Sequence, residues 1–138
     1  MAGILVIAEA VNGALAPISG ELIGAAKKLS AEGAGSVTAL VAGDASLAQG
    51  LIAAGADNAI AATNANLATG TADAYVPAIE AALAQSGADI VLLGQTSLGR
   101  DLGPAIAFKL GTAVAMDCVE LKIEGGKLQA TRSAYGGN

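Results

Sequence analysis

Short apolar runs recur along the chain, and segments with helical spacing separate them. The first run, residues 4–8, is continuous rather than alternating, which is typical of a strand covered on both faces in a parallel sheet. We expect it to be the first and central strand. Similar runs follow at 36–42 and, most strongly, at 89–94, and a weaker one lies at 58–62. The pattern therefore predicts at least four strands.

Helical segments lie between these runs. Pro17 is placed to open the first helix, whose apolar residues keep helical spacing as far as Ser30, where two nearby glycines end it. Ser46 is expected to cap a short second helix over 47–54. Both helices stop just before a predicted strand, so strand and helix alternate.

A third helix is predicted to run to about Gln85, with Pro77 within its first turn. One face of this helix is marked by Tyr75, Ile79, Ala82 and Leu83. A fourth helix is predicted over 98–110, with Ser97 as its N-terminal cap and Gly111 at its end.

Alternation of this kind predicts the α/β class, with an open, mainly parallel sheet, right-handed crossovers and helices on both faces. Beyond Ala113 the pattern changes, because 118–123 and 127–132 alternate their side chains around Glu124-Gly125-Gly126. This predicts a C-terminal β-hairpin that extends the sheet edge or projects toward a neighbour. We expect residues 1–138 to form one domain.

Composition narrows the choice of partners. The hydrophobic fraction is 54% but aromatics are only 2%, so the core is expected to be built from small and aliphatic side chains. A net charge of −5 and the lack of any basic run argue against nucleic acid. No apolar run reaches the roughly 20 residues that cross a bilayer, and residues 1–10 lack the features of a signal peptide. We therefore expect a cytoplasmic, bacterial-type protein without membrane insertion.

Most catalytic constellations cannot be assembled from this chain. It contains no histidine, so the usual general base and the usual zinc sites are missing. Cys118 is the single cysteine, so no internal disulfide can form, and beside Asp117 it is expected to be inert and half-buried. We expect no catalytic site and no metal site.

Nucleotide motifs are absent from the sequence, and one loop remains as a candidate site. Neither Gly-x-Gly-x-x-Gly after the first strand nor a Walker loop occurs. The loop 94–101 follows a strand and opens a helix, where ligands gather in open α/β sheets, and it contains Ser97, Arg100 and Asp101. The alternative interpretation is structural: Ser97 caps the helix and Asp101 favours its positive end.

Two segments carry a resemblance to a known family. Residues 88–102, Ala-Asp-Ile-Val-Leu-Leu-Gly-Gln-Thr-Ser-Leu-Gly-Arg-Asp-Leu, resemble the corresponding stretch of electron-transfer flavoprotein alpha subunits. Residues 131–138, Thr-Arg-Ser-Ala-Tyr-Gly-Gly-Asn, are similar to the family's Thr-Arg-Pro-x-Tyr-Gly-Gly-Asn segment, with Ser133 where proline is common. The opening strand and the Ala-Ala-Lys-Lys-Leu stretch agree as well, so the resemblance spans the chain.

The resemblance implies an alpha-beta heterodimer that carries FAD and passes electrons from dehydrogenases to a quinone oxidoreductase or another acceptor. It also implies that most FAD contacts come from a carboxy-terminal domain absent from residues 1–138, so no flavin ligand is assigned here. AMP is expected on the beta subunit. This domain would then support the beta subunit and the mobile FAD domain, with Ser97, Arg100, Asp101, Arg132 and Tyr135 as possible interface or loop residues.

Two other functions stay open at this stage. One is a small nucleotide-binding module of the universal-stress or adenine-nucleotide-hydrolase-like type, which has a similar order of elements but needs a glycine cluster near the last strand. The other is an independent enzyme, which the lack of histidine and clustered carboxylates disfavours. The Ala-rich helix segment 78–84 would leave apolar surface unless a partner or its own sheet covers it.

Overall fold

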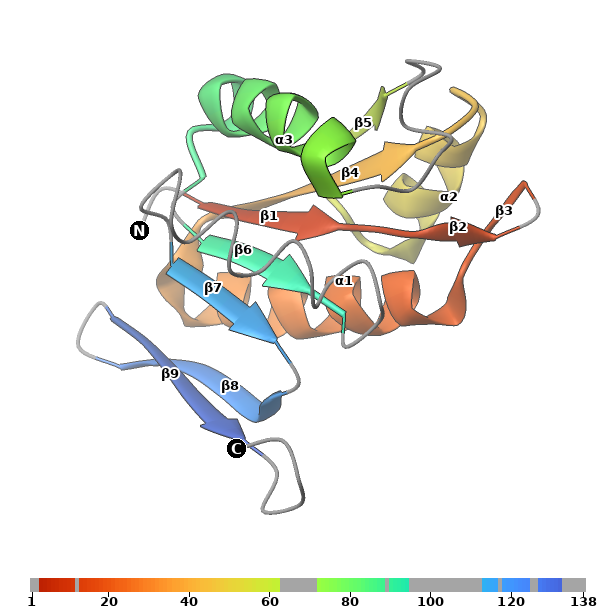
Figure 1. Ribbon diagram of the computed structural model, residues 1–138. Coiled ribbons are helices and arrows are strands. Elements are labelled where there is room, and N and C mark those ends of the chain that lie inside the picture. Colours follow the sequence, from red (N-terminus) through yellow and green to blue (C-terminus); the bar gives the residue numbers. More distant parts are fainter. Residues whose placement is uncertain are drawn as a thin grey trace.

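A five-stranded parallel sheet forms the centre of the molecule. The computed structural model describes residues 3–11, 13–62, 72–88, 90–94, 113–116, 118–124 and 127–132 (Figure 1). The sheet has the order β5-β4-β1-β6-β7, and each neighbouring pair is parallel. Its strands are β1 (Gly3–Ile7), β4 (Ser36–Ala42), β5 (Asn58–Ala62), β6 (Ile90–Leu93) and β7 (Ala113–Met116). The predicted fold class and the central place of β1 are confirmed.

Helices cover both faces of this sheet (Figure 1). One face carries α1 (Pro17–Leu29) and α2 (Leu47–Ala54), and the other carries α3 (Ala72–Ser86). A π-helical turn, η1 (Ser30–Ala34), follows α1, and Gly33 within it has φ 102°, a conformation that few residues other than glycine adopt. The predicted end of the first helix at glycine is therefore confirmed.

Alternate residues of the central strand enter two separate cores. Ile4 and Val6 pack with α1 and α2, whereas Leu5 and Ile7 pack against α3. All four are at most 1% exposed. Because a strand points successive side chains to opposite faces, burial on both faces requires the continuous apolar run that the sequence shows.

Two antiparallel hairpins complete the described part. β2 (Ala10–Val11) pairs with β3 (Ala14–Leu15) just beyond β1. β8 (Cys118–Glu124) pairs with β9 (Lys127–Arg132), with an irregularity between Cys118 and Glu120, and this hairpin lies beyond β7 on the α1 side (Figure 1). The predicted C-terminal hairpin is confirmed. The sequence pattern missed β7, which precedes the hairpin and pairs with β6.

Two local predictions need correction. Ser46 is the N-cap residue of α2, as predicted, but its side chain makes no capping hydrogen bond. Instead, the Ser46 amide donates to Asp44 Oδ1 over 2.8 Å, and this bond is the main cause that lowers the pKa of Asp44. Pro77 lies inside α3 rather than in its first turn, because the helix already begins at Ala72. The predicted fourth helix over 98–110 lies outside the described residues.

Asp57 ties the start of β5 to the start of β4. Its Oδ2 accepts the Val37 amide proton over 2.8 Å, and its own amide donates to the Val37 carbonyl over 2.9 Å. Lys27 Nζ lies 3.4 Å from Asp57 Oδ1. The Val37 hydrogen bond, more than Lys27, holds the pKa of the Asp57 carboxyl below its ordinary value.

We expect Asp57→Ala to lower the free energy of unfolding at neutral pH by about 1 kcal/mol or less, because the carboxylate is partly exposed. A depressed folded pKa adds stability above the unfolded value of 3.8, and that stability is lost as pH falls through the folded pKa. The difference between the two proteins should therefore shrink in acid. Urea denaturation across this pH range measures it, with Glu80→Ala, an exposed carboxylate on α3, as control. A difference that grows in acid would contradict the assignment.

Candidate functional site

The carboxyl ends of β1 and β6 meet at the point where the strand order reverses. In open α/β sheets this switch point is the usual ligand crevice. Glu9 follows β1 closely and Gly94 follows β6, so both lie at this edge. The helix start that would face a bound phosphate is that of α1, which begins at Pro17.

Side chains of the chain itself occupy this crevice. A Cβ added to Gly94 would lie 2.7 Å from Ile18 Cγ1 and 3.5 Å from Glu9 Oε2, so only glycine permits this close packing. Ser19, which is 1% exposed, accepts the Glu9 amide proton and donates to the Glu9 carbonyl, each over 2.9 Å. Within the described ranges, the switch point is therefore a tightly packed joint.

Tyr75 lies on the other face of the sheet from α1, where its phenol senses the charge of Glu9. It is 7% exposed on α3, and burial raises the pKa of its phenol, with a further contribution from the Glu9 charge. The phenol therefore stays neutral near pH 7. Because Tyr75 also packs in the core between α3 and the sheet, its role is to anchor the helix.

Most of the predicted site residues fall outside the described part. This holds for Ser97, Arg100, Asp101 and Tyr135. Arg132 is the last residue of β9, and its backbone pairs with that of Cys118 at the start of β8. The interface or loop role of these residues stays a prediction.

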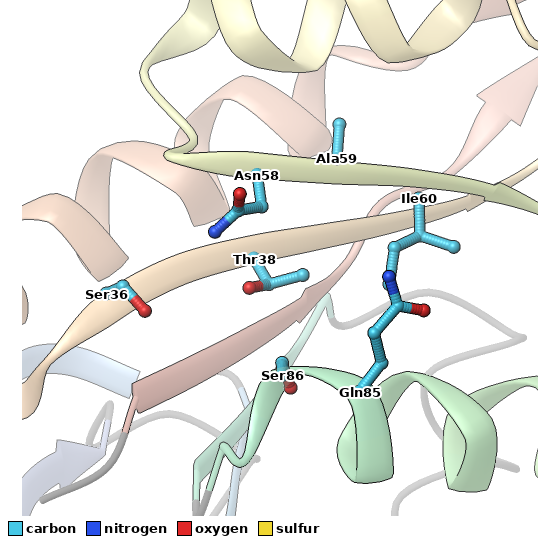
Figure 2. Close-up of a pocket in the computed structure, with 7 residues that line it drawn as sticks. All are labelled: Ser36, Thr38, Asn58, Ala59, Ile60, Gln85 and Ser86. Carbon is cyan, nitrogen blue, oxygen red and sulfur yellow. The ribbon is translucent and has the colours of Figure 1, made fainter.

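A polar pocket, which the sequence analysis missed, opens at the opposite edge of the sheet. It has a volume of about 280 Å³ and lies between the amino ends of β4 and β5 and the carboxyl end of α3. Figure 2 shows its lining, with Gln85 extending from α3 toward Ile60 and the Ala59 side chain pointing away. The lining residues are Ser36, Thr38, Asn58, Ala59, Ile60, Gln85 and Ser86. The available signal was the spacing of Ser36 and Thr38, two residues apart on one strand face.

The described ranges contain neither a membrane-spanning helix nor a cluster of metal-binding side chains. None of the helices there is long and apolar enough to span a membrane. In the same ranges, no three side chains of the metal-binding types Asp, Glu, Cys and His form a group that could hold an ion.

The sheet order, the helices on both faces and the glycine-dependent joint define an open parallel α/β domain of the doubly wound kind. Comparison with known protein families identifies the family within this fold class. The model of the electron transfer flavoprotein domain matches residues 4–138, and the chain belongs to this family.

Curated relatives agree with this family. The chain is 37% identical to the electron transfer flavoprotein subunit alpha of Clostridium acetobutylicum, over 99% of this chain and 42% of the relative. It is 34% identical to the subunit of the same name from Bacillus subtilis, over 97% of this chain and 41% of the relative. An acryloyl-CoA reductase electron transfer subunit beta from Anaerotignum propionicum is 32% identical over 88% of this chain and 34% of its own length. The chain thus spans about two fifths of the curated relatives it matches.

Proposed function

We propose that this domain is the docking scaffold of an alpha-type electron-transfer flavoprotein subunit. The single observation that carries this proposal is the family match over residues 4–138, which includes the sheet, the helices and the C-terminal hairpin. The relatives named as alpha subunits support the alpha assignment. In this role the domain binds a beta subunit and supports a mobile FAD domain, and it performs no chemistry itself.

The flavin is proposed to lie mainly outside residues 1–138. Two observations support this. The chain spans 42% of the length of the Clostridium relative. The switch point, where a nucleotide would be expected, is filled by the Ile18 side chain. AMP is proposed to bind the beta subunit rather than this domain.

The docking surface is proposed to include the hairpin β8-β9 and the loop with Ser97, Arg100 and Asp101. An isolated two-stranded hairpin is marginally stable in water, so it gains from contact on more than one side. β8 lies beside α1 and η1, and the hairpin projects past the sheet (Figure 1). Arg132 at the end of β9 and Tyr135 beyond it belong to this proposed surface.

The redox partners of the intact carrier are proposed from its relatives. We propose that it accepts electrons from dehydrogenases and passes them to a quinone oxidoreductase or another acceptor. The relative named as an electron transfer subunit of a reductase supports a redox enzyme as one direct partner.

Co-expression with a beta subunit tests the docking role. We expect a one-to-one complex that carries AMP but no stoichiometric flavin, because the scaffold binds the beta subunit without the FAD domain. Native mass spectrometry and analysis of the released nucleotide measure both properties. A chain that stays alone and binds a nucleotide itself would instead support the small nucleotide-binding module.

A further inference from the structure

The polar pocket is built from paired positions on two neighbouring strands. Thr38 and Asn58 are direct partners in the parallel register of β4 and β5. Ser36 lies two residues before Thr38 and therefore on the same face of β4, the face that packs against α3. Further along this face the core is apolar, with Leu40 buried. The change from apolar to polar side chains is thus confined to the amino edge of the sheet.

Thr38 is the most buried polar group of this set. The residue is 3% exposed, and its hydroxyl makes no hydrogen bond with any residue that the structure describes. Among the described residues no buried side-chain N or O atom lacks a partner, so this hydroxyl is open to the pocket. The side chains of Ser36, Asn58 and Gln85 likewise have no such bond, while Ser86 Oγ accepts the Ala88 amide proton over 3.2 Å. The hydroxyls of Ser36 and Thr38 and the carboxamides of Asn58 and Gln85 are therefore available to an external hydrogen-bonding molecule.

The charge of the pocket selects against ions. All its lining side chains are neutral hydroxyls, carboxamides or apolar groups. An ion that entered would lose hydration without gaining an opposite charge. The carboxyl end of α3 also faces the pocket, and its last turn has no basic residue to balance the negative end of the helix dipole. An anion is therefore disfavoured most.

We propose that this pocket binds a small, neutral polyhydroxylated molecule of about monosaccharide size. Hydroxyl groups donate and accept hydrogen bonds, as do the hydroxyls and carboxamides of the lining. The volume of about 280 Å³ equals roughly nine water molecules at about 30 Å³ each, which suits one sugar ring and not a dinucleotide. The site lies at the opposite sheet edge from the switch point, and none of its lining residues belongs to the proposed docking surface.

The test uses glucose as the probe. Glucose is added to the purified, isotope-labelled protein in whatever oligomeric state or complex the protein is isolated. We expect shifts in the amide NMR signals of Thr38, Asn58 and Ser86, with millimolar affinity. Thr38→Val and Gln85→Ala should each weaken binding by about fivefold, because each removes one hydrogen-bonding group. Gln49→Ala is the matched control, since Gln49 is an exposed glutamine on α2 across the sheet. Glucose 6-phosphate and protonated glucosamine test the requirement for a neutral ligand.

Thr38→Val is also expected to change the stabilisation of the protein by glucose. A threonine that serves only the fold would not have this effect. The heat stability of the free protein should change little, because the Thr38 hydroxyl makes no hydrogen bond with a described residue, while the extra stabilisation by glucose declines. Sugars also stabilise most proteins because they are excluded from the protein surface. This general effect should be equal in Thr38→Val and Gln49→Ala, so the difference between the two variants in stabilisation by glucose reports binding in the pocket.

Several results would overturn the proposal. These are an absence of amide shifts, binding that survives both Thr38→Val and Gln85→Ala, and equal or tighter binding of the phosphate or the amine. If Thr38→Val fails to fold, the exposed residues Asn58 and Gln85 still decide the outcome through their alanine variants.

Discussion

Replacing Ile79 with alanine is expected to lower the free energy of unfolding by about 3 kcal/mol. Ile79 is 0% exposed and joins α3 to the core formed by Leu5, Ile7 and Leu40. The helix is otherwise rich in alanine, so few neighbouring side chains can move to fill the cavity. For a domain of this size the melting temperature should fall by roughly 10 °C.

The matched control is Ile52→Ala on α2, the same substitution at a position that is 47% exposed. It should change the free energy of unfolding by less than about 0.5 kcal/mol, because little burial is lost and alanine favours the helix. Thermal and urea denaturation of both variants give the comparison. Equal losses in the two proteins would show that Ile79 is not the anchor of α3.

Replacing Ser19 with alanine is expected to cost about 2 kcal/mol. The Ser19 hydroxyl makes two hydrogen bonds to the backbone of Glu9, and Ser19 is buried while Glu9 is half-buried. The variant leaves the Glu9 amide without this acceptor. Its hydrogen exchange should accelerate by about tenfold or more, as the joint between β1 and α1 opens locally.

Ser30→Ala is the control for this prediction. Ser30 is half-buried at the carboxyl end of α1, and its hydroxyl makes no hydrogen bond with a residue in the described ranges. Its replacement should leave both stability and exchange at Glu9 nearly unchanged. Exchange at Glu9 that is as slow in Ser19→Ala as in the unchanged protein would contradict the proposed role of the joint.

The strands predicted from continuous apolar runs agree with the structure because burial on both faces leaves no alternative pattern. The hairpin β8-β9 was predicted for a different reason, since its alternation and its Gly-Gly turn are local features. β7 was missed because two of its four residues are alanine, which is a weak strand former, and its place in the sheet depends on its pairing with β6. Ser46 was predicted to cap α2 because serine is a common capping residue. In the structure the turn before α2 instead places the Asp44 carboxylate within hydrogen-bonding distance of the Ser46 amide.

The candidate sites were much harder to predict from the sequence than the strands. No sequence motif indicates that the Ser19 side chain forms hydrogen bonds with the backbone of Glu9, ten residues earlier. The pocket needs the register of Thr38 with Asn58 and the position of Gln85 on α3, and these residues lie up to several tens of positions apart in the chain. Sequence spacing alone cannot place such groups together. The face shared by Ser36 and Thr38 was the only local sign.

By itself, the sequence determined the class of fold, the central strand, the hairpin and the family, because these depend on periodicity, on turn residues and on matched segments that are local in the chain. The tertiary structure alone decided the strand order, the fifth strand, the filled switch point and the polar pocket. Each of these depends on contacts between distant segments, whose energies come from packing and shared hydrogen bonds rather than from the preferences of single residues.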